Sequence, residues 1–167
     1  MSDRKDKVDK KSDKHKFDAL DLEILARLQE DARHSYREIA NELGISVGTV
    51  HNRIQKLTNA NILMGFQPIL NSKTLGFDLC FLILLTIRGD DSGEFLQEIK
   101  NDPSVRAIYH TTGDHNVALI CRFKKIEDAR EFITQISQAP QVEKTVSNLV
   151  LDVVKEDLNV DVHLLNK

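Results

Sequence analysis

Residues 39–57, IANELGISVGTVHNRIQKL, decide the fold of the first part of this chain. Apolar residues recur at helical spacing on both sides of the short break Gly44-Ile45-Ser46, which predicts two amphipathic helices. Gly44 is typical of the left-handed residue that ends a helix, and Ser46 is typical of the residue that caps the next one. Two helices joined by so short a turn predict a helix-turn-helix, whose second helix enters the DNA major groove; a plain helical hairpin is the alternative.

Start signals stand before the first helix of this pair and before one earlier helix. Residues 35–38, SYRE, form a capping box, and Asp18 or Asp21 stands near the start of a first helix. One face of that first helix is apolar: Leu20, Ile24, Leu25 and Leu28. The pattern therefore predicts a three-helix module over residues 17–62. Residues 63–77, which contain Gly65 and Pro68, are interpreted as a short wing strand or as a linker.

The second helix of the motif should turn a polar face to DNA, because Val50, Ile54 and Leu57 face the core. Asparagine and arginine can make paired hydrogen bonds to adenine and guanine edges, so Asn52 and Arg53 are the candidate base readers. Basic residues near the start of the preceding helix favour phosphate, which peptide N–H groups also attract there. The full set of expected DNA contacts is Arg33, Arg37, Ser46, Gly48, Thr49, Asn52, Arg53 and Lys56.

Charge is distributed unevenly along the 167 residues, whose formal net charge is −3. Residues 1–16 carry seven Lys or Arg side chains against four Asp, a local net charge of +3. Such a polar segment cannot bury enough surface to fold, so we expect a flexible basic arm that either touches DNA phosphates or is an inert tail. The rest of the chain is acidic, so any DNA contact must be local.

No signal peptide is expected, because the N-terminus is charged and lacks an apolar stretch. The longest apolar run, residues 79–85, is far shorter than the roughly 18 residues that suggest a membrane span. These features predict a cytoplasmic protein with no membrane partner. Cys80 and Cys121 lie in apolar strands and are interpreted as reduced core thiols.

The second half alternates strands and helices. Strands are predicted over residues 79–87, 106–111, 117–123 and 146–154, and helices over residues 94–100 and 126–136. The order βαββαβ predicts an α+β, ferredoxin-like sandwich over residues 78–157, followed by a tail over residues 158–167. Several of its strands are apolar on both faces, although two helices can cover only one face of the sheet. A second copy is the expected cover, which predicts a homodimer.

The chain resembles the Lrp/AsnC family of leucine-responsive or feast/famine transcription regulators. The resemblance covers about residues 17–157 and rests on LDLEILARLQEDAR from Leu20, on residues 39–57, on TTGDHNVALICRF from Thr111 and on PQVEKTVSNLVLDVVKED from Pro140. It implies a DNA-binding domain followed by a domain for dimerisation and amino-acid sensing (the RAM domain). It also implies that dimers build octamers or similar rings, with small effectors bound between dimers.

The resemblance also implies an effector loop. Its residues here are Thr111, Thr112, Gly113, Asp114 and Asn116. The family pattern commonly has an aspartate where Asn116 stands, and a neutral amide keeps the hydrogen bonding without the charge. Plain hairpin-turn chemistry is the alternative for Gly113 and Asp114.

Other chemistry finds no support in the sequence. We find no Gly-rich phosphate loop, no cluster of Cys and His at metal-ligand spacing and no nucleophile elbow. The sequence therefore predicts no enzyme, no cofactor and no metal. Two other classes remain open: an architectural, nucleoid-type DNA-binding protein without an effector, and a small-molecule sensor or enzyme whose DNA domain is vestigial.

Overall fold

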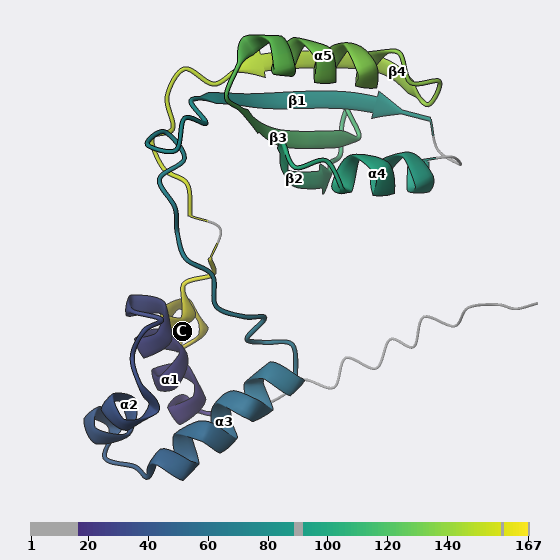
Figure 1. The fold of residues 1–167 in the computed structure, drawn as a ribbon. Coiled ribbons are helices and arrows are strands. Elements are labelled where there is room, and N and C mark those ends of the chain that lie inside the picture. The colour runs from purple at the N-terminus through teal and green to yellow at the C-terminus, as the bar shows by residue number, and fades with distance from the viewer. Residues whose placement is uncertain (1–16, 89–91, 158, 167) are drawn as a thin grey trace, which may run out of the picture. The chain divides into compact units, whose positions relative to one another are not determined.

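The computed structural model describes residues 17–88, 92–157 and 159–166. The chain divides into two compact units (Figure 1). The described residues up to Pro68, together with the C-terminal segment that follows Asp157, form the helical unit, and residues 69–157 form the sheet unit. None of the described helices is long and apolar enough to cross a membrane.

The helical unit begins with three capped helices, as predicted. Helix α1 (Ala19–Glu30) starts at Asp18, whose carboxylate accepts a hydrogen bond from the Asp21 N–H, and the two residues form a capping box. Helix α2 (Tyr36–Leu43) starts with the predicted capping box and ends at Gly44, whose φ of 65° is the left-handed conformation that glycine tolerates. Helix α3 (Val47–Asn59) is capped by Ser46.

The core of the helical unit lies where α2 and α3 meet α1. Ile24 of α1, Ile39 of α2 and Val50 of α3 are fully buried together, with the small Ala40 at the crossing. The helix-turn-helix is confirmed. The segment ILMGFQPIL that follows contains no strand in the structure, so residues 63–77 connect the units as extended chain and turns rather than as a wing strand.

The sheet unit has the predicted order βαββαβ. Its strands are β1 (Leu79–Ile87), β2 (Val105–His110), β3 (Val117–Phe123) and β4 (Val142–Leu149), and its helices are α4 (Ser92–Lys100) and α5 (Ile126–Ser137). The strands form one antiparallel sheet in the order β2-β3-β1-β4. The ferredoxin-like architecture is therefore confirmed, with β2 and α4 shifted by one or two residues from their expected bounds.

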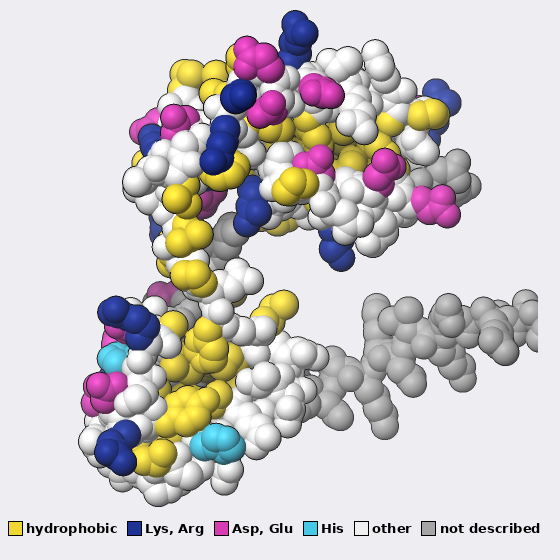
Figure 2. Space-filling model, in the orientation of Figure 1, with side chains coloured by type: hydrophobic (Ala, Val, Ile, Leu, Met, Phe, Trp, Pro, Cys, Tyr) yellow, Lys and Arg dark blue, Asp and Glu magenta, His cyan; other side chains and the backbone are white. Residues whose placement is uncertain are grey.

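The last strand was predicted wrongly over residues 146–154. It begins four residues earlier, at Val142, because it pairs with β1 from Ile87 back to Phe81, and it ends at Leu149 where this pairing ends. The apolar residues beyond it, including Val154 at 94% exposed, belong to a connecting segment. Hydrophobic side chains stand exposed along both segments that connect the units (Figure 2), and this unusual composition produced the error.

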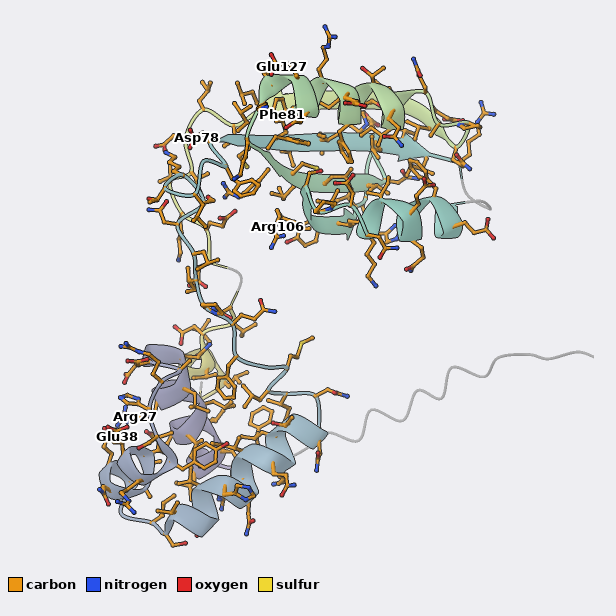
Figure 3. All side chains as sticks on the ribbon, viewed as in Figure 1. Arg27, Glu38, Asp78, Phe81, Arg106 and Glu127 are labelled. Carbon is orange, nitrogen blue, oxygen red and sulfur yellow. The ribbon has the colours of Figure 1, made fainter. Side chains whose placement is uncertain are left out.

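The two faces of the sheet differ. On one face Ile83 and Leu85 of β1 are fully buried against α4 and α5, together with Phe81, which Figure 3 labels on the side of the sheet that α5 covers. On the other face none of the described helices of this unit packs. The strand registers bring one set of side chains together on that side, here called the open face: Leu82, Leu84, Tyr109, Ala118, Ile120 and Val146.

Candidate nucleic-acid interface and effector loop

The exposed side of α3 carries a line of residues that begins at its N-cap. Ser46 accepts a hydrogen bond from the Thr49 N–H at 3.0 Å, and the two hydroxyl groups are 2.8 Å apart, so both side chains serve the cap. Gly48 and Asn52 follow on the exposed surface. His51 and Gln55 lie there too, although sequence reasoning did not single them out as contacts. A helical-wheel count from Gly48 would have found Gln55, which lies two turns further on.

Gly48 is not required by the fold. A Cβ atom at this position would meet only the Ser46 Oγ, at 3.7 Å, which is an ordinary contact. Glycine inside a helix costs about 1 kcal/mol relative to alanine. The helical unit therefore accepts this cost without a steric reason of its own, which fits a surface that another molecule approaches closely.

Arg53 lies on α3 but is bound within the helical unit, which differs from the expectation of a free reading side chain. Its Nη1 donates to both carboxylate oxygens of Asp18 at 2.7 Å and to Asp21 Oδ1 at 2.8 Å. The Asp21 side chain is fully buried, and Lys56 Nζ lies 3.6 Å from its other oxygen. Arg53 thus ties α3 to the start of α1, and its hydrogen bond lowers the pKa of Asp18 below its ordinary value.

The basic residues before and within α2 are exposed. Arg33 makes a two-point contact with Asp31, from Nε at 3.1 Å and from Nη2 at 2.9 Å. This contact lowers the pKa of Asp31 from its ordinary 3.8 to about 2. Arg33 is thus held beside an acid, whereas Arg37 projects from the first turn of α2 at an exposed position. Residues 1–16, the predicted basic arm, lie outside the described residues.

The expected effector loop, residues 111–116, joins β2 to β3 and is tied to β1. Asn116 Oδ1 accepts a hydrogen bond from the Ile87 N–H at 2.8 Å, and its Nδ2 donates to the Ile87 carbonyl at 2.7 Å. Both ends of the Asn116 amide are therefore bonded to the backbone of one residue, Ile87. Thr86 Oγ1 donates to the Asp114 carbonyl at 2.8 Å, and Thr111 Oγ1 donates to the His115 carbonyl. Thr86 and Ile87 were missed because only the β1–β3 register brings them to the loop.

The tip of the loop is left open to solvent. Thr112, Gly113 and Asp114 are exposed, and Gly113 has a φ of 110°, which strains any other residue. The loop backbone is thus held by its flanking side chains while the Asp114 carboxylate stays accessible. This arrangement suits both a hairpin turn and a ligand contact.

Asn116→Asp is expected to destabilise the protein by roughly 1–3 kcal/mol, because the carboxylate cannot donate to the carbonyl of the buried Ile87 and places charge against it. Urea unfolding followed by circular dichroism measures this. Asp114→Asn, the reverse exchange at the exposed loop tip, is the control and should change stability by less than about 0.5 kcal/mol. Equal stability of Asn116→Asp and the wild type would remove the proposed anchoring role of Asn116.

Among the described residues no three His, Cys, Asp or Glu side chains are grouped so that they could hold a metal ion. Cys80 and Cys121 are free thiols and both are buried. Burial raises the pKa of Cys121 to about 12, so this thiol stays protonated and unreactive.

A helix-turn-helix unit joined to a ferredoxin-like sheet unit defines a class of two-domain DNA-binding transcription regulators. Residues 17–64 match the family described as "Winged helix-turn-helix DNA-binding", and residues 80–160 match the one described as "Lrp/AsnC ligand binding domain". This chain belongs to the Lrp/AsnC family of DNA-binding transcription regulators, as the sequence resemblance indicated.

Known relatives agree with this assignment. An uncharacterized HTH-type transcriptional regulator of Pyrococcus abyssi is 38% identical over 145 residues, which are 87% of this chain and 99% of the relative. The HTH-type transcriptional regulator Ptr1 of Methanocaldococcus jannaschii is 39% identical over 119 residues, 71% of this chain and 80% of Ptr1. Relatives of this kind are transcriptional regulators rather than enzymes.

Solved structures support the fold over both units. The structure of E. coli AsnC superimposes with a TM-score of 0.80 at 25% identity and covers 88% of this chain and 99% of its own. The regulator NMB0573 of Neisseria meningitidis, solved as a complex with L-Met, gives a TM-score of 0.81 at 22% identity over 90% of this chain and 99% of its own.

Proposed function

We propose that this regulator reads pseudo-palindromic DNA in the cytoplasm as a homodimer or larger assembly of dimers, under the control of an amino acid or a related small molecule. The observation that carries the proposal is the composition of the exposed side of α3. It combines a glycine that the fold does not require with exposed polar residues of the kind that read bases.

Asn52 is the residue we assign to base reading. It is exposed on α3, one turn beyond Gly48, and its amide can make a paired hydrogen bond to adenine. Gln55 can make the same kind of contact and extends this line of residues. Lys56 is assigned to the DNA phosphate backbone, which its positive charge attracts. Arg33, Arg37, Ser46 and Thr49 flank this surface and are assigned to phosphate contacts. Arg53 is assigned first to holding α3 in place.

The open face supports a dimer. A single copy would leave Leu82, Leu84 and Ile120 in contact with water, although all three are apolar. Packing of two open faces around a twofold axis would cover both at once. It would also supply the second recognition helix that a small helix-turn-helix needs for useful affinity. The family resemblance extends this to an octamer or another ring of dimers.

The effector assignment rests on the ligand-binding family match and on the loop. Thr111, Thr112, Gly113, Asp114 and Asn116 are the proposed effector residues. Because the Asn116 amide is already bonded to Ile87, we assign it to positioning the loop, and we assign contact with an amino group to the exposed Asp114 carboxylate.

Asn52→Ala is expected to weaken binding to a preferred palindrome by about 1–3 kcal/mol and to leave binding to random duplexes much less changed. Fluorescence anisotropy at one fixed salt concentration measures both. Asn101→Ala, at an exposed position of the sheet unit, is the matched control and should bind as the wild type does. An equal loss on chosen and random DNA would remove the sequence-reading claim and favour an architectural protein.

A further inference from the structure

Helix α1 is apolar on two sides, and only one of them belongs to the main core shared with α2 and α3. Ile24 and Leu28 belong to the main core of the helical unit. Leu22, Leu25, Ala26 and Gln29 follow the spacing i, i+3, i+4, i+7 along a second side. Leu22, Leu25 and Ala26 are also buried. We call this second side of α1, together with Leu57 of α3, the outer surface.

The C-terminal segment of the chain covers the outer surface. Its short 3₁₀ helix η1 (Val162–Asn166) begins with Val162, which is 8% exposed and packs with Leu25, Ala26 and Leu57. A residue only five positions from the end of the chain is thus part of a buried cluster in the helical unit.

A polar contact fixes where the segment docks. Gln29 Nε2 donates to the Val160 carbonyl at 2.7 Å, and Gln29 Oε1 accepts a hydrogen bond from the Val162 N–H at 3.4 Å. One side-chain amide therefore bonds to the backbone on both sides of residue 161. This pairing selects a single register, which hydrophobic contact alone would not do.

The docking changes how the two units are connected. The chain leaves the helical unit after Pro68, builds the sheet unit, and returns to the helical unit after Asp157. With the segment docked, the three helices are linked to the sheet unit twice, covalently through the chain after Pro68 and non-covalently through the docked segment; with the segment released, only the covalent link remains. A second connection closes a loop and so reduces the arrangements that the units can sample.

We infer that the outer surface of α1 is a docking site for residues 160–166 of the same chain, and that the docked segment is a releasable second tether of the DNA-reading unit. The contact is small, because Leu164 and Leu165 of η1 remain 59% and 48% exposed and Val162 supplies the buried side chain. A contact of this size opens more readily than the core does. This inference rests on the proposed function, since it concerns the spacing of two recognition helices in a dimer.

Val162→Asp and, separately, Gln29→Ala in the full-length chain test the tether. Affinity is measured for an isolated half-site and for inverted repeats whose spacer is lengthened in single base pairs. The affinity of the wild type should fall at least about tenfold when the spacer is half a helical turn too long. The affinity of each variant should fall less than about threefold with the same spacer. The affinity of each variant for the isolated half-site should stay within about twofold of the wild-type value. Leu164→Asp, at an exposed position of η1, is the control and should behave as the wild type does.

Each outcome decides something. Variants that keep the wild-type discrimination would overturn the tether. A wild type that binds no duplex would instead contradict the proposed function. In that case hydrogen exchange still tests the docking by itself. Exchange in α1 and in residues 160–166 should quicken at least about tenfold in Val162→Asp, and unchanged exchange would overturn the docking.

A crosslink identifies the occupant of the docking site. The double variant Gln29→Cys/Val160→Cys, treated with a short bifunctional thiol reagent, should yield a crosslinked single chain, since the native thiols are buried. A covalent dimer would mean that the segment comes from a second copy and would overturn the assignment to the same chain.

Discussion

Arg53→Ala is expected to lower the free energy of unfolding of the helical unit by roughly 3 kcal/mol, because it leaves the Asp21 carboxylate buried without its nearest partner. Arg53 Nη1 lies 2.8 Å from Asp21 Oδ1, and Asp21 is fully buried. Lys56 remains, but at 3.6 Å and more than half exposed it cannot replace the guanidinium. Thermal and urea unfolding followed by circular dichroism measure the loss.

The control is Lys56→Ala, which removes the more distant cation and should cost less than about 1 kcal/mol. The double variant Arg53→Met/Asp21→Leu replaces the ion pair by apolar side chains and should recover most of the stability. If Arg53→Ala were as stable as the wild type but lost discrimination between duplexes, Arg53 would be a base reader and the assignment to holding α3 would fail.

Leu82→Lys/Leu84→Lys is expected to separate the dimer into single copies. Both residues lie on the open face, at the centre of the β3-β1-β4 part of the sheet. Two lysines in each copy would place four like charges in a desolvated contact, which should raise the dimer Kd by at least about a hundredfold. Sedimentation velocity measures the Kd, and affinity for a palindrome should fall with it.

Ile126→Lys provides the matched control. Ile126 is an exposed apolar residue at the start of α5, on the helix-covered side of the sheet, so the same kind of exchange there should leave assembly unchanged. A folded Leu82→Lys/Leu84→Lys variant that sediments as an intact dimer would move the interface away from the open face.

Local signals predicted most of the fold. The start of α1 at Asp18, the capping box at Ser35, the left-handed Gly44 and the cap at Ser46 each depend on residues within four positions, so the sequence displays them directly. Strands β1 and β3 were predicted at their observed bounds because their burial interrupts an otherwise polar pattern. Strand β4 was misplaced because its position depends on pairing with β1, more than fifty residues earlier.

The parts that could not be predicted depend on contacts between distant residues. The ion pair of Arg53 with Asp21 spans 32 positions, and the bonds of Asn116 to Ile87 span 29. The contact of Gln29 with Val160 spans 131. Arg53 and Asn116 were singled out from the sequence and Gln29 was not, but in all three cases the partner was set by the tertiary fold. A residue whose type alone suggests contact with a DNA base or an effector can therefore have a structural role instead.

The central claim is that two recognition helices of a dimer read one DNA site together. The most direct test selects bound duplexes from a random pool, with and without an amino-acid mixture, and then measures the mass of the selected complex by light scattering. The wild type should enrich an inverted repeat whose half-site centres lie about one helical turn, roughly 10 base pairs, apart, with at least two copies of the chain on each repeat. A single copy that binds every duplex alike would contradict the account.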